Sequence, residues 1–109
     1  MELYHTTDHR GVSELNPSIK KMRALIDSLD ERSVDEADHP DISLVHDPSG
    51  WSLSVYPSGI VTLENLDDVR ETTRYMKDVS RNQAHKLWIK LSCGEIAYVK
   101  NLPWILNEA

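Results

Sequence analysis

Three short segments, 42–46, 51–56 and 60–64, occupy the middle of this sequence and are separated by two turn-forming stretches. The first stretch, 47–50, has Asp, Pro and Gly where a type I turn favours them, and the second, 57–59, is Pro-Ser-Gly. In the first two segments apolar and polar residues alternate, which is typical of strands with one buried face. Because strands joined by short turns run antiparallel, the sequence predicts a three-stranded meander.

The middle segment predicts how the sheet is oriented. Its residues form one apolar set and one hydroxyl set: Trp51, Leu53 and Val55 against Ser52, Ser54 and Tyr56. We expect the apolar set to point toward helices, because a sheet with one apolar face must cover it. The hydroxyl set fits a ligand site. It also fits the solvent side of a sheet that is covered on one face, which is the commoner arrangement.

Two helices are predicted on either side of the meander. The first spans 17–30, with Asn16 as N-cap and Pro17 at the first helical position. Its apolar residues recur with a period of 3.6: Leu15, Ile19, Met22, Leu25, Ile26 and Leu29. The second spans 66–80, capped by Asn65 or Asp67. Its apolar side consists of Leu66, Val69, Met76 and Val79.

Two further strands, 87–91 and 96–100, are predicted with a hairpin turn over 92–95. Residues 1–15 are interpreted as an edge strand or a partly disordered end. We therefore expect a single domain over 1–109 of the α+β class. Its antiparallel sheet has about five strands and two helices on one face, in the order α-β-β-β-α-β-β. The apolar tail 102–106 is expected to dock on this body or on a second subunit.

Charge is unevenly distributed along a chain whose net charge is −6. Residues 27–47 hold eight acidic residues and one arginine, whereas 70–100 hold seven basic and three acidic residues. The acidic stretch 31–41 has few apolar residues, so we expect a mobile loop there. Its carboxylates are candidate partner-binding groups: Asp35, Glu36, Asp38 and Asp41.

A basic stripe is predicted on the helix 66–80. It consists of Arg70, Arg74, Lys77 and Arg81, spaced to fall on one helical face. Such a stripe suits an acidic protein segment or phosphate. The alternative is a solvated face partly neutralised by Glu71 and Asp78.

No catalytic, metal-binding or cofactor-binding residue is assigned from the sequence. His5 and His9 have a spacing that suits a metal only on a helix, and Gly11 with two threonines argues against one. A second cluster lacks the spacing of known zinc sites: His39, Asp41, His46 and Asp47. Cys93, placed in a turn, has neither a helix N-terminus nor cations beside it to activate a thiol. The chain also has no glycine-rich phosphate loop.

Composition narrows the functional classes. A single cysteine needs no oxidising compartment, and the sequence shows no signal peptide and no membrane-spanning run, so a cytoplasmic protein is expected. The negative charge argues against nucleic acid as a partner.

These features favour a non-enzymatic protein that binds another protein. One version is a toxin-neutralising protein, immunity- or antitoxin-like, whose acidic segment 27–47 masks a basic nuclease site. A second interpretation is a self-assembling homodimer that pairs through strand 96–100 and the tail around Trp104. A third is a small-ligand or anion-binding domain that uses the basic stripe or the open face of the sheet.

Overall fold

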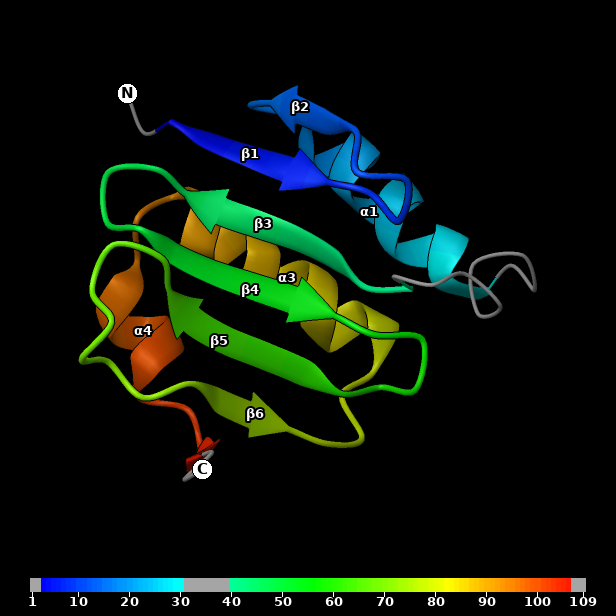
Figure 1. Cartoon of the computed structure of the whole chain (residues 1–109). Coiled ribbons are helices and arrows are strands. Elements are labelled where there is room, and N and C mark those ends of the chain that lie inside the picture. Colours follow the sequence, from blue (N-terminus) through cyan, green and yellow to red (C-terminus); the bar gives the residue numbers. More distant parts are fainter. Residues whose placement is uncertain (1–2, 31–39, 107–109) are drawn as a thin grey trace.

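A computed structural model describes residues 3–30 and 40–106, which form an α+β structure around one seven-stranded antiparallel sheet. The strands are β1 (Tyr4–Thr7), β2 (Ser13–Leu15), β3 (Ile42–His46), β4 (Trp51–Val55), β5 (Val61–Asn65), β6 (Arg74–Met76) and β7 (Ile105–Leu106). Their order across the sheet is β2-β1-β3-β4-β5-β6-β7 (Figure 1). The predicted class and antiparallel pairing are confirmed, but the sheet has more strands than expected.

The helices of the described part all lie on one side of the sheet (Figure 1). They are α1 (Ile19–Asp27), followed by the 3₁₀ turn η1 (Ser28–Asp30), then α3 (Arg81–Ser92) and α4 (Ile96–Lys100). Helix α3 packs against β3, β4 and α1. Its residue Trp88 is fully buried. The opposite side of the sheet carries no helix from the described residues (Figure 1).

The predicted meander is present as β3, β4 and β5. The register pairs Leu44 with Leu53 and Leu53 with Leu63, and all three side chains are fully buried beneath the helices. Trp51 and Val55 share this face and are also buried. The alternation in 51–56 therefore predicted the helix-covered face correctly.

The prediction of a helix over 66–80 is wrong. Asn65 does accept backbone hydrogen bonds through its side chain, from Asp67 N and Asp68 N at 2.9 Å each, as an N-cap would. The chain then continues as a loop into β6, which pairs with β5. Val69, assigned to the apolar helix face, is 96% exposed. An Asx turn and a helix N-cap use the same hydrogen bonds, so the side chain alone did not distinguish them.

The predicted strands 87–91 and 96–100 are also wrong, because both segments are helical. Helix α3 begins at a capping box in which Ser80 Oγ accepts from Gln83 N and the Gln83 side chain accepts from Ser80 N. Its buried residues recur at helical spacing: Ala84, Leu87, Trp88 and Leu91. The segment 92–95 is the end of this helix rather than a hairpin turn. The predicted element order fails here.

The first helix is confirmed but begins later than predicted. Its N-cap is Ser18, whose Oγ accepts from Lys21 N at 3.2 Å. Asn16 instead adopts a φ of 48° and its side chain accepts from Tyr4 N at 2.8 Å, so it joins the helix entrance to β1. Met22 and Ile26 are fully buried, whereas Leu15 and Ile19 are exposed.

Both ends of the described chain enter the sheet. Strand β1 lies between β2 and β3, so the N-terminal region supplies an interior strand as well as the edge strand β2. At the other end β7 pairs with β6, and Trp104 Nε1 donates to Val99 O at 2.7 Å. The apolar tail therefore docks on its own domain. Of the predicted loop 31–41, only Pro40 and Asp41 lie within the described residues.

Candidate functional site

A row of hydroxyl side chains crosses the face of the sheet opposite α1, α3 and α4 (Figure 1). We call it the hydroxyl row; from β2 to β6 it consists of Ser13, Thr7, Ser43, Ser54, Thr62 and Tyr75. Each residue is paired in register with the next, so one hydroxyl from each of six adjacent strands stands at the same level of the sheet. Paired residues in antiparallel strands project to the same face, about 4.5–5.5 Å apart. The Oγ atoms of Thr7 and Ser13 lie 2.9 Å apart, within hydrogen-bond distance.

The centre of this face has small side chains. Ser54 is 7% exposed, and Ser52, on the same face of β4, is 4% exposed. No helix of the described part covers them (Figure 1).

A hollow lies at each end of the hydroxyl row. The hollow near β6 has a volume of about 410 Å³, and its lining includes Tyr56, Ile60, Thr62 and Tyr75. The hollow near β1 has a volume of about 330 Å³. It is lined by Thr7 and Ser43 of the row together with Asp8, His9, Arg10, Gly11 and Asp41. One end is thus aromatic and the other is charged.

Burial and two nearby carboxylates raise the pKa of Tyr56. Burial raises the pKa of the Tyr56 hydroxyl, and the negative charges of Asp41 and Glu64 raise it further. The phenol therefore keeps its proton and remains a hydrogen-bond donor at neutral pH. Glu64 is paired with Ser52 on the same face, so acidic groups adjoin the hydroxyl row.

His9 is the least satisfied polar side chain of the charged hollow. Its Nδ1 atom is buried and has no hydrogen-bond partner among the described residues. His5 lies in β1 rather than on a helix and is paired with Asp47, with Nδ1 2.9 Å from Oδ1. In 3–30 and 40–106 no group of three or more His, Cys, Asp or Glu side chains is placed to hold a metal ion.

Of the four acidic candidates only Asp41 can be located. It lines the charged hollow next to Ser43 and acts on the pKa of Tyr56. Asp35, Glu36 and Asp38 lie outside the described residues. The C-terminal end of the acidic stretch thus adjoins the hydroxyl row, an association that sequence spacing did not indicate.

The predicted basic stripe does not exist, because residues 66–80 are not helical and its four cations separate. Arg70 pairs with Asp68 at 3.0 Å and lowers the pKa of that carboxyl. Lys77 lines a cavity on the helix side of the sheet. Arg81 begins α3 and pairs with Asp30 at 3.0 Å.

The fourth cation, Arg74, belongs to a cluster around Trp51. The Arg74 guanidinium and the Lys100 ammonium lie 5.4 and 5.0 Å from the centre of the Trp51 ring. Glu71 pairs with Arg74 at 3.0 Å and approaches Lys100 at 3.9 Å. This cluster links the loop after β5 to the end of α4.

Cys93 lies at the end of a helix rather than in the predicted hairpin turn, and the remaining histidines are dispersed. Cys93 is exposed at the C-terminal cap of α3. His85 Nε2 lies 3.0 Å from Ile19 O and links α3 to α1. His46 is buried, with Nδ1 2.7 Å from Ser49 Oγ in the turn after β3. His39 lies outside the described residues.

Comparison of the chain with family models, with curated proteins and with solved structures found no match. None of the helices in the described ranges is long and apolar enough to cross a membrane. The function is therefore inferred from the residues and their geometry.

Proposed function

We propose that this chain is a small non-enzymatic interaction protein that binds a positively charged protein through the hydroxyl row and its two hollows. The observation that carries the proposal is the register that aligns one hydroxyl from each of six strands on the face opposite α1, α3 and α4. The row itself contains no charged residue, and charged residues are depleted in the cores of protein interfaces. Tyrosine and serine side chains together supply rigid contact area and adaptable hydrogen bonds.

Charge supports a basic partner. The acidic residues beside the row are Asp8, Asp41 and Glu64. Among the described residues that line the two hollows, the one arginine or lysine is Arg10, in the charged hollow. Complementary charge at the rim of an interface accelerates association and selects partners. A toxin-neutralising protein that masks a basic nuclease site is the most specific version of this proposal. A cytoplasmic location belongs to the same proposal, because the only cysteine, Cys93, needs no oxidising compartment.

The two other interpretations relied in part on elements that the structure places differently. The homodimer was to pair through residues 96–100, which form helix α4, and through Trp104, which is bonded within its own chain. The small-ligand or anion-binding domain was to use the basic stripe, whose members lie on different parts of the structure, or the open face of the sheet. The open face is the surface that the present proposal uses.

The test uses the basic proteins encoded next to this gene. Each is titrated against the immobilised chain at about 50 mM and about 300 mM salt, because surface charge pairs are screened over this range. We expect one such protein to bind, and more weakly at the higher salt. Thr62→Arg should weaken binding at least about tenfold by placing a bulky cation on the row. Asp41→Asn should weaken it less.

Lys20→Gln is the matched control, because Lys20 is exposed on α1, a helix on the other side of the sheet. It should bind as the unmodified chain does. If no neighbouring basic protein binds, the toxin-neutralising role is refuted. If a partner binds Thr62→Arg and Lys20→Gln equally well, and both variants melt normally, the hydroxyl row is not the interface.

A further inference from the structure

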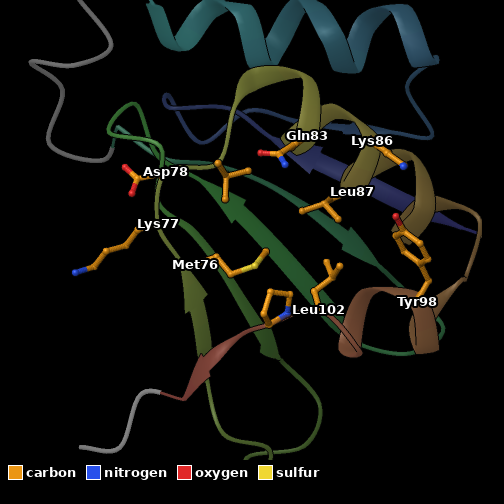
Figure 2. A pocket seen from close by; sticks show the side chains of 10 residues that line it. Met76, Lys77, Asp78, Gln83, Lys86, Leu87, Tyr98 and Leu102 are labelled. Atoms are coloured by element: carbon orange, nitrogen blue, oxygen red, sulfur yellow. The ribbon is translucent and has the colours of Figure 1, made fainter.

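A separate cavity of about 310 Å³ lies on the helix side of the sheet (Figure 2). It is open to solvent on one side and is lined by residues of β6, α3, α4 and the segment before Trp104. Met76, Leu87 and Leu102 project into it (Figure 2), and Val79 adds to the apolar lining. An apolar cavity of about half this volume is large enough for benzene.

Two of the polar residues that line the cavity, Lys86 and Tyr98, lie at its α3–α4 rim. The Lys86 ammonium lies 6.0 Å from the centre of the Tyr98 ring, and both side chains line the cavity. In Figure 2 Lys86 and Tyr98 stand on the same side, whereas Lys77 and Asp78 extend away from the apolar lining on the other side. An ammonium and a phenol thus adjoin the apolar floor.

Lys86 is the available cation at this rim. Lys90 also approaches Tyr98, at 5.1 Å, but it is paired with Glu95 at 3.4 Å. Lys86 has no carboxylate partner among the described residues. With Lys77 and Asp78, which also line the cavity, Lys86 gives the lining a net charge of +1. That charge matches a ligand with one negative charge and an apolar body better than a multiply charged phosphate ligand.

We propose that this cavity binds an amphiphilic monocarboxylate, that is, an acyl chain or ring with a single carboxylate. The apolar body lies against Met76, Leu87 and Leu102, and the carboxylate accepts hydrogen bonds from Lys86 and the Tyr98 hydroxyl. Burial of the apolar part provides the attraction, and the charged hydrogen bonds orient the ligand. This site is on the other side of the sheet from the hydroxyl row, so it stands or fails independently of the proposed function.

The experiment is a titration with octanoate, followed by NMR on the isotope-labelled chain. We expect saturable shifts at the Met76, Leu87 and Leu102 methyl groups. Acetate, which lacks the chain, and octylammonium, which carries the opposite charge, should each bind at least about tenfold more weakly. If octanoate gives no saturable shift at these methyl groups, or binds no better than octylammonium, the proposal is refuted.

Two variants separate the carboxylate contact from general packing. Lys86→Gln should weaken octanoate binding about five- to tenfold, as expected for the loss of a charged hydrogen bond. It should leave octylammonium binding no weaker. Tyr98→Phe should weaken octanoate binding about two- to fivefold. Lys20→Gln is the control and should leave it unchanged. If Lys86→Gln retains the full preference for octanoate over octylammonium, Lys86 does not hold the carboxylate.

Discussion

Trp88 Nε1 donates a hydrogen bond to Leu53 O at 3.0 Å, and both side chains are fully buried. The bond joins the middle of α3 to the central strand β4. A buried indole N–H without an acceptor would be costly, so this contact fixes where α3 lies on the sheet.

Trp88→Phe should destabilise the fold by about 2–4 kcal/mol, because it removes the hydrogen bond and leaves a void beneath the ring. Urea unfolding followed by circular dichroism measures the change. Trp104→Phe is the comparison: it also loses an indole bond, to Val99 O, but at a partly buried site. It should cost less. Equal losses would mean that the contact with Leu53 has no special role.

Gly50→Ala should be more destabilising than Gly11→Ala. Both glycines have positive φ, 76° and 81°, so either substitution strains the backbone by about 1 kcal/mol. A Cβ at Gly11 would meet nothing within 4 Å, whereas a Cβ at Gly50 would lie 2.7 Å from Asp67 Cγ. Thermal unfolding of both variants measures the difference.

The pair of substitutions Gly50→Ala and Asp67→Ala isolates that clash. In the Asp67→Ala background the cost of Gly50→Ala should fall toward that of Gly11→Ala without reaching it, because the Cβ of residue 67, 2.9 Å from the added Cβ, remains. A cost that stays high would place the strain in the turn itself rather than at Asp67.

Stability should decrease above about pH 10, in part through Tyr56. Its pKa is raised in the folded protein, first by burial and then by Asp41 and Glu64. A raised pKa gives a contribution that is complete below the unfolded pKa and is lost as the pH rises through the folded one. Urea midpoints between about pH 8 and about pH 11.5 should therefore fall less steeply in Tyr56→Phe.

Tyr4 should contribute to the same loss of stability at high pH. Its pKa is also raised, by burial and then by Cys93, and its hydroxyl donates to Pro17 O at 2.6 Å. Tyr56→Phe should therefore remove only part of the pH dependence. Asp41→Asn should shift the absorbance titration of Tyr56 toward lower pH. If the titration does not shift, the charge of Asp41 does not act on Tyr56.

Truncation after Lys100 should destabilise the protein at every concentration without changing its sedimentation. It removes β7, which pairs with β6, and Trp104, which packs against the core. Loss of this partly buried apolar segment should cost about 2–5 kcal/mol. A dimer of the full chain that becomes a monomer on truncation would instead show that the tail forms a subunit contact.

The meander was predictable because its signals are local. Alternation over 51–56 and the two turns depend on neighbouring residues. The alternation correctly assigned Leu53 and Ser54 to opposite faces of the sheet. The helix α3 was missed because the run 87–91 was considered without the capping box at Ser80 and without Ala84. A window that begins at Ser80 shows the helical period.

The candidate site was only partly predictable. Ser52, Ser54 and Tyr56 were identified as a hydroxyl face from one strand. The row itself depends on the register of β1, β2 and β6 against their neighbours, which no local pattern specifies. Asp41 was expected at a binding surface for its charge, but its position beside Ser43 results from the tertiary fold.

The separation of 35 residues between Leu53 and Trp88 also bears on how the chain is made. The meander leaves the ribosome before α3, the helix that packs against β3 and β4, so part of its apolar face is uncovered until α3 follows it through the exit tunnel. Strand β7 and Trp104 come later still. Stable packing of the meander therefore has to wait until α3 has been synthesised, and the nascent meander is a segment for which chaperones would compete.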